Sequence, residues 1–234
     1  MVPEVVRFFL SGVCHQIPDH SLAIGGQALP LCARCTGAFL GIVGGLVALW
    51  ASGQGRLSGM PRGWVRLPLV CAALAWALDG SNSFAGLILG RAPLYPPSNA
   101  LRLVTGIGLG LALSTLLYPI VQYAVAPGAR DEPVLGQPRH AAAVLAAGLG
   151  LAALLLGWPP EWHPVWAAPL AGALVAVATF SVLTLVNSVA VILVLKKEGA
   201  AKEWRAIVPY AMVGLTASLT ETGLLALIRR LIEG

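Results

Sequence analysis

LVTGIGLGLALSTLLYPIVQYAVAPGA, residues 103–129, is a run without a single Asp, Glu, Lys or Arg. A helix that crosses a membrane needs about 20 mostly apolar residues, because lipid offers the peptide backbone no hydrogen-bond partners and the helix must satisfy its own. The run is long enough and apolar enough to meet this requirement. It therefore predicts a membrane-spanning helix at roughly residues 101–126.

Similar runs lie on both sides of this one, in a chain that is poor in charge. Of its 234 residues, 57% are hydrophobic and only 11% are charged, whereas an ordinary soluble domain is roughly 25% charged. This composition excludes a soluble globular protein. It predicts an all-α, polytopic integral membrane protein, a single transmembrane domain over residues 1–234 with about six spans. The spans are expected roughly at residues 36–54, 67–90, 101–126, 141–158, 166–195 and 206–228.

The segment before the first span, residues 1–35, is predicted to form a short amphipathic helix followed by a loop that holds Cys and His. It begins MVPEVVRFFLSGV, with an early Glu4 and without a basic stretch. A secretory signal peptide has a basic start and a small-residue cleavage site, so we do not expect one here. We expect this segment to lie on the membrane or to dip into it.

Charged loops indicate the direction in which the chain crosses the membrane. Lys and Arg are more numerous in the loops near residues 53–66, 127–140 and 196–205 than in the opposite loops. Because such loops tend to stay in the cytoplasm, we expect both termini outside, in a multi-pass protein of the cell inner (plasma) membrane. The net charge of +5 follows from this loop bias, and no nucleic-acid motif appears. The expected partners are therefore membrane lipids and subunits of a membrane complex, but not nucleic acid.

Cysteine and histidine are concentrated near the N-terminus. The chain has four Cys and four His, and most of them lie in CHQIPDH at residues 14–20 and CARC at residues 32–35. Cys-x-x-Cys is a spacing that brings two sulfurs to one metal ion, and a tetrahedral zinc site takes four ligands, commonly Cys with His. We predict a metal site, with zinc as the expected ion. Its predicted ligands are Cys14, His15, Cys32 and Cys35, with His20 as the alternative to His15.

The same cysteines allow two other interpretations. Cys32 and Cys35, at a helix start and beside Arg34, would have lowered thiol pKa values and could act in a thiol-disulfide oxidoreductase that uses a quinone. A disulfide is also allowed on an oxidising outer side. In the third interpretation these residues are ordinary small buried side chains without a cofactor. No hydrolase or nucleotide-binding motif appears, so the sequence assigns no enzyme class.

Polar residues within the predicted spans are candidates for ligand binding, because an ionisable side chain at mid-bilayer is costly unless it is paired or faces water. Asp79 lies about midway along the second span, with Asn82 on the same face. Asn99 and Arg102 lie at the outer end of the third span. The candidate site for an anionic or polar ligand, in a cavity beside the metal, consists of Arg34, Asp79, Asn82, Asn99 and Arg102. The alternative is that Asp79 forms a buried ion pair with Arg102 or Arg34 that fixes helix packing.

The last span also contains a carboxylate, Glu221, for which helix packing is the preferred role. A third class of function, a transporter or an accessory subunit of a membrane complex, is kept open by these intramembrane carboxylates. A transporter would depend on Asp79 or Glu221. Arg229 and Arg230, near the end of this span, are expected to anchor lipid headgroups.

Small residues open two of the predicted spans. Gly37 and Gly41 begin the first span, and Gly106 and Gly110 begin the third. Small residues four apart let two helices approach closely, which is the preferred interpretation. An internal repeat of the kind found in transport proteins is the alternative.

The N-terminal motifs also carry a family resemblance. CHQIPDHSL at residues 14–22 and LPLCARCTGAFLG at residues 29–41 resemble the signature of an uncharacterised prokaryotic membrane family, domain of unknown function 2085. The similarity covers roughly the first half of the chain, through Asp79 and residues 99–106. Family members often have an Arg after the CHQ-x-P segment, where this chain has His20. The resemblance implies a membrane location and a special Cys/His site, and it brings no known activity.

Overall fold

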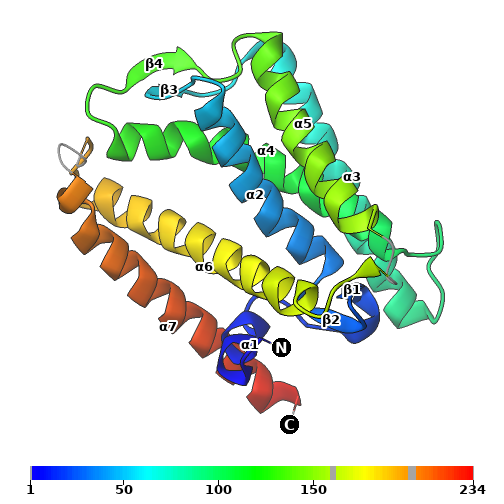
Figure 1. Ribbon diagram of the computed structural model, residues 1–234. Helices are drawn as coiled ribbons and strands as arrows, with labels where there is room; N and C mark the ends of the chain where they lie inside the picture. Colours follow the sequence, from blue (N-terminus) through cyan, green and yellow to red (C-terminus); the bar gives the residue numbers. More distant parts are fainter. Residues whose placement is uncertain (1, 159–161, 200–203, 234) are drawn as a thin grey trace.

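The computed structural model describes residues 2–158, 162–199 and 204–233, which form a bundle of long helices (Figure 1). Five helices in this part of the chain are long and apolar enough to cross a membrane. They are α2 (Ala33–Ala51), α4 (Asn99–Val125), α5 (Pro138–Leu156), α6 (Ala167–Val194) and α7 (Val208–Glu233). The predicted all-α, polytopic membrane fold is thus confirmed. A short amphipathic helix, α1 (Glu4–Ser11), precedes them as expected.

The remaining long helix, α3 (Arg66–Leu89), covers the second predicted span but is not among the five. It is 24 residues long, and its buried residues are the polar Asp79, Asn82 and Ser83, which lower its apolar character. Large apolar side chains such as Leu74 and Leu78 are exposed instead. A helix with its polar side inside and its apolar side outside suits lipid surroundings. In Figure 1, α3 returns the chain from the end of α2 to the start of α4, as a sixth span would.

Two small sheets at opposite ends of the bundle were not expected from the sequence. At one end β1 (Ser21–Ile24) and β2 (Gln27–Cys32) form an antiparallel hairpin. Gly25 and Gly26 make its turn with φ angles of 56° and 73°, a backbone conformation that glycine adopts without strain. At the other end β3 (Leu57–Gly59) pairs in parallel with β4 (Arg130–Pro133). The strands are only three to six residues long. Their sequences lack the alternation of apolar and polar residues by which a strand is predicted.

Both described ends of the chain lie at the same end of the bundle. Figure 1 shows α1, the β1–β2 hairpin, the starts of α2 and α4 and the end of α7 gathered there. The β3–β4 pair lies at the opposite end. This arrangement agrees with an even number of crossings and places both termini on one side. Which side faces the cytoplasm stays a prediction.

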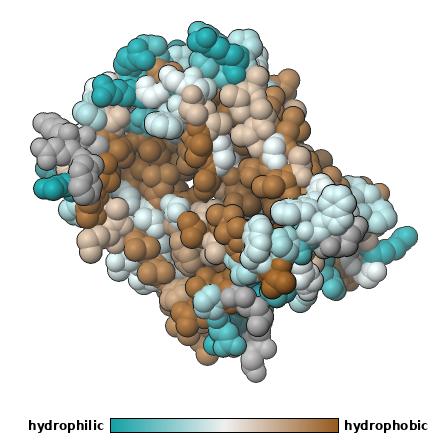
Figure 2. Space-filling model, viewed as in Figure 1, coloured by the Kyte–Doolittle hydropathy of each residue, from teal (hydrophilic) through white to brown (hydrophobic). Residues whose placement is uncertain are grey.

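The surface of the bundle suits a lipid environment. Figure 2 shows hydrophobic residues over much of the face in view, while strongly hydrophilic residues collect near its ends. Large apolar side chains are exposed along every long helix, among them Val47 on α2, Leu149 on α5 and Val177 on α6. Water would make such a surface unfavourable, whereas lipid tails are as apolar as these side chains.

The most extensive helix contact is between α2 and α4, and it includes the small residues that open both helices. A Cβ atom added to Gly106 would lie 2.2 Å from the backbone oxygen of Arg34, and one added to Gly37 would lie 2.4 Å from that of Leu103. Backbone therefore meets backbone at this crossing. The prediction that these glycines permit close helix approach is confirmed, and the contact fixes the start of α4 beside the start of α2.

Candidate metal centre

Three of the cysteines meet at the end of the bundle where α2 begins. Cys14 lies shortly after α1, Cys32 is the last residue of β2, and Cys35 lies in the first turn of α2. Their sulfur atoms all lie within 4.8 Å of one another, and all three thiols are free. Cys14 is buried and the other two are half-buried. The structure thus gathers three cysteines that could hold a metal ion.

A tight turn directs Cys14 toward the other two cysteines. Gln16 has a φ of 53°, which is uncommon for a residue other than glycine. This conformation lets the backbone N–H of Gln16 donate to the Cys14 sulfur at 3.5 Å. The Gln16 side chain holds the turn in place, because its Nε2 donates to the backbone oxygen of Arg7 at 3.0 Å.

Two further backbone N–H groups point at the sulfurs. The N–H of Cys32 donates to the Cys14 sulfur at 3.3 Å, and the N–H of Cys35 donates to the Cys32 sulfur at 3.5 Å. Through this second bond Cys32 caps the N-terminus of α2. Donated hydrogen bonds and the positive end of a helix dipole both favour the thiolate over the thiol. Each of these N–H groups therefore makes a thiolate less costly at the sulfur that accepts it.

The hydrogen bonds within the cluster shift the pKa values of Cys32 and Cys14 in opposite directions. Hydrogen bonds from the side chains of Cys14 and Cys35, together with backbone N–H groups, hold the pKa of Cys32 well below its usual range. The hydrogen bond between Cys14 and Cys32, together with burial, raises the pKa of the Cys14 thiol. Cys32 is thus the cysteine of the cluster at which a thiolate is most favoured, because the thiols of Cys14 and Cys35 can donate hydrogen bonds to its sulfur.

A residue from the far end of the chain supports the Cys14 turn. Arg229, in the last turns of α7, donates through Nη1 to the backbone oxygen of Cys14 and through Nη2 to that of His15, each at 2.8 Å. The sequence suggests only a headgroup anchor for Arg229, and the structure places it on the cluster instead. A separation of 215 residues between Arg229 and Cys14 leaves no local sequence signal for this contact.

Replacing Arg229 with alanine is expected to open the Cys14 turn. A hydrogen bond from a charged donor contributes about 1.5–3 kcal/mol, so the labelling rate of Cys14 by a maleimide should rise roughly tenfold or more. Mass spectrometry of labelled peptides measures that rate. Arg230→Ala is the matched control, because Arg230 stacks 4.7 Å over the Phe8 ring and loses the same charge. Equal Cys14 labelling in both variants would refute the role of Arg229.

The two histidines near the cluster are placed differently. His15 is exposed and is not among the three residues whose ligand atoms lie within 4.8 Å of one another. His20 is half-buried, and its pKa is lowered, first by burial and then by the charge of Arg102, with Cys32 acting in the opposite direction. His20 is therefore in electrostatic reach of the cluster, while His15 faces outward.

Asp79 forms an ion pair with Arg34, one of the two partners expected for it. Its side chain is only 1% exposed, and that of Arg34 is 18% exposed. Arg34 binds one Asp79 oxygen through Nη2 and through Nε, the latter at 3.1 Å, while the Tyr95 hydroxyl donates to the other oxygen at 3.1 Å. Because Arg34 lies between Cys32 and Cys35 in the chain, this pair ties α3 to the cysteine cluster.

The other predicted ligand residues are also engaged by the protein. Asn82 accepts a hydrogen bond from the Leu94 N–H and donates to the Tyr95 oxygen, each at 2.9 Å, so it holds the loop that follows α3. Asn99 donates to the backbone oxygens of Asp19 and Ser21 at 3.0 Å each. These amides therefore position loops in this structure.

Glu221 lies in the middle of α7 and is not part of the cysteine cluster. Its side chain is exposed, and the Asn187 amide of α6 donates to it at 3.4 Å and to Ser218 at 3.0 Å. The contact joins α6 to α7. Glu221 is thus not one of the residues of the candidate metal centre, and its setting agrees with its preferred packing role.

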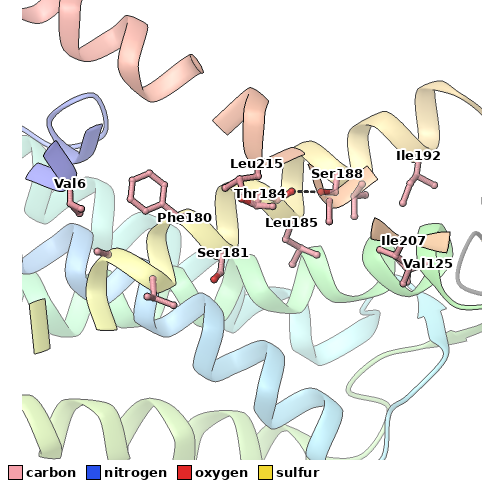
Figure 3. A pocket seen from close by; sticks show the side chains of 14 residues that line it. Val6, Val125, Phe180, Ser181, Thr184, Leu185, Ser188, Ile192, Ile207 and Leu215 are labelled. Atoms are coloured by element: carbon pink, nitrogen blue, oxygen red, sulfur yellow. Dashed lines mark hydrogen bonds between the residues drawn. The ribbon is translucent and has the colours of Figure 1, made fainter. Parts of the chain in front are cut away.

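An apolar groove runs between α6 and α7 (Figure 3), and two of its lining residues, Ala176 and Phe180, belong to the same hydrophobic cluster as the three cysteines. Its volume is about 590 Å³, and its labelled lining includes Phe180, Leu185 and Ile192. The hydroxyl of Ser188 donates to the backbone oxygen of Thr184 at 2.6 Å, so it is already satisfied within α6. None of the residues that line this groove is a Cys, a His or a carboxylate.

Comparisons with known proteins find a related family and one related protein. No solved structure matches the chain. The uncharacterized protein MJ1492 of Methanocaldococcus jannaschii is 29% identical to it over 108 residues, which are 46% of this chain, and the match spans 63% of that protein's length. A family model described as "Predicted membrane protein (DUF2085)" matches residues 14–116, from Cys14 into α4. The resemblance of the CHQIP and CARCTG motifs is thereby confirmed, and residues 14–116 are matched by this family of predicted membrane proteins.

Proposed function

We propose that this membrane protein binds a zinc ion through the thiolates of Cys14, Cys32 and Cys35. One observation supports the proposal most directly: three sulfurs converge within 4.8 Å of one another, although 18 residues separate Cys14 from Cys32. Zinc–thiolate bonds of about 2.3 Å in a tetrahedral site place sulfurs roughly 3.8 Å apart. The cluster is therefore close to the size that a zinc ion requires.

The chemistry of the ligands also favours zinc. Thiolate sulfur is a soft ligand that selects zinc and related ions over magnesium or calcium. The N–H groups of Gln16, Cys32 and Cys35 act as the hydrogen-bonding layer that orients metal ligands. Three protein ligands leave the fourth tetrahedral position for His20, for water, or for His15 if its side chain rotates toward the cluster.

In this proposal the ion joins three parts of the chain at the membrane surface. Cys14 belongs to the segment after α1, Cys32 to the hairpin and Cys35 to α2. The metal would therefore fasten the N-terminal segment to the first span, next to the Arg34–Asp79 pair. From the loop charges we propose the cell inner membrane, with this end of the bundle outside.

Metal analysis of the purified protein tests the proposal. Protein extracted in a mild detergent and washed free of loose metal is expected to retain about one zinc ion per chain. Cys14→Ser, Cys32→Ser and Cys35→Ser should each lose most of it. Cys71→Ser is the matched control, because Cys71 is free, exposed and outside the cluster. Equal zinc in the Cys32→Ser and Cys71→Ser proteins, or none in the wild type, would refute the proposal.

Thiol-disulfide exchange, in which a quinone could accept the electrons, is the second candidate function. The observation that favours it is the position of the free Cys32 sulfur at the start of α2, where it accepts from the Cys35 N–H at 3.5 Å. This setting favours the thiolate, which is the form that attacks a disulfide. Mild oxidation followed by alkylation and mass spectrometry should then show a Cys32–Cys35 disulfide that forms and is reduced reversibly. Cysteines that stay fully free under these conditions would rule out this second function.

A further inference from the structure

Arg102 is a buried cation at the start of α4. It is only 6% exposed, and its Nη1 donates to Asn99 at 2.7 Å. Its Nε has no hydrogen-bond partner among the described residues. A buried guanidinium without an anion is strongly unfavourable, so its charge calls for a partner nearby.

The other charged groups around Arg102 do not provide that partner. Arg34 and Asp79 form an ion pair of their own and cancel each other. Asp19 is exposed, so water and salt screen its charge. Among the described residues near the start of α4, the ordinary ionised side chains thus leave one uncompensated positive charge, that of the buried Arg102.

The cysteine cluster lies in the same layer as Arg102. Gly106 of α4 contacts the backbone of Arg34, and Gly37 of α2 contacts that of Leu103, so the first turns of the two helices are pressed together. Asn99, which binds Arg102, also binds the backbone oxygen of Ser21. Ser21 is paired with Cys32 in the β1–β2 hairpin. A short chain of contacts therefore leads from Arg102 to the sulfur cluster.

We infer that Arg102 is the electrostatic partner of the metal centre and that the centre selects a divalent ion. This inference rests on the proposed metal-binding function. A divalent ion held by three thiolates carries one net negative charge, which Arg102 matches. A monovalent ion would leave two negative charges, and a trivalent ion would leave none. Of these three, only a divalent ion gives the centre the single negative charge that cancels the positive charge of Arg102.

Charge matching makes a prediction that a purely structural role for Arg102 does not make. Arg102→Gln leaves the centre with an uncompensated negative charge and should weaken metal binding. Adding Asp79→Asn then removes another negative charge and frees Arg34 to compensate the centre. The second substitution should therefore restore binding, although it breaks an ion pair.

Co²⁺ titration of the purified full-length protein in detergent, read from its thiolate absorption bands and by competition with a chelator, tests this inference. Arg102→Gln is expected to weaken Co²⁺ binding about 10–100-fold, whereas Arg102→Lys and the exposed control Arg91→Gln should bind like the wild type. The Asp79→Asn/Arg102→Gln protein should recover most of the loss. Equal affinity in Arg102→Gln and wild type, or no recovery in the double variant, would overturn the inference.

Two further outcomes keep the test decisive. A wild type that takes up no Co²⁺ or Zn²⁺ would refute the metal site itself, which is a different result from unchanged binding in Arg102→Gln. If Arg102→Gln does not fold, Asp79→Asn alone decides the question. Charge matching predicts unchanged or tighter Co²⁺ binding in that variant, since one negative charge beside the centre is gone. Weaker binding would contradict it.

Discussion

Gly106→Ala is expected to separate α2 from α4 and to destabilise the protein by about 3 kcal/mol or more, the upper range for an overpacked contact. The added methyl group would lie 2.2 Å from the backbone oxygen of Arg34. A backbone atom cannot rotate away as the end of a side chain can, so the helices themselves must move. Because Arg34 and Cys35 lie in the first turn of α2 and Cys32 caps that helix, the cysteine cluster should be disturbed with it.

Gly108→Ala on the same helix is the matched control. Its methyl group would lie 3.8 Å from the Ala72 side chain, an ordinary contact. Alanine also favours helix over glycine by about 1 kcal/mol, so this variant should be as stable as the wild type or more stable. Thermal unfolding followed by circular dichroism in detergent compares the two. Similar midpoints for the two variants would mean that α2 and α4 do not touch through their backbones.

Asp79→Ala is expected to cost about 3–5 kcal/mol, the usual result of removing one partner of a buried ion pair. The substitution leaves Arg34 with Ser83 as its remaining side-chain acceptor and removes the acceptor of the half-buried Tyr95 hydroxyl. The loop after α3 should loosen, since Tyr95 is held there partly by Asp79. Unfolding measurements in detergent report the loss of stability.

Glu132→Ala is the control for this second prediction. Glu132 pairs with Arg130 at 3.4 Å, but both side chains are 60% exposed, and exposed pairs contribute at most about 1 kcal/mol. Asp79→Leu combined with Arg34→Met should recover much of the stability, because an apolar pair carries no uncompensated charge. A loss in Asp79→Ala as small as in Glu132→Ala would show that the buried pair is not formed.

The helices could be predicted from the sequence because lipid imposes a simple rule on it. Runs without charge must be at least as long as a membrane is thick, and the predicted spans at residues 101–126 and 166–195 correspond to α4, Asn99–Val125, and α6, Ala167–Val194. Boundaries differ by only a few residues, since helix caps such as Ser98 are set by local hydrogen bonds rather than by hydropathy.

Part of the candidate site could also be predicted, and part could not. Cys32 and Cys35 are close in sequence, so their spacing alone predicts that they meet. The contribution of Cys14 depends on the hairpin and on the turn at Gln16, whose positive φ has no simple sequence signature. The choice of Arg34 over Arg102 as the partner of Asp79 depends on how α2, α3 and α4 pack, which no local pattern specifies.

The contact between Arg229 and the Cys14 turn has a consequence for the order in which the molecule is made. Chains are synthesised from the N-terminus, and their segments fold as they emerge. Cys14 is therefore made 215 residues before the arginine that holds its turn. We expect the cluster to remain loosely formed and open to labelling during synthesis, and to close only when α7 has entered the membrane.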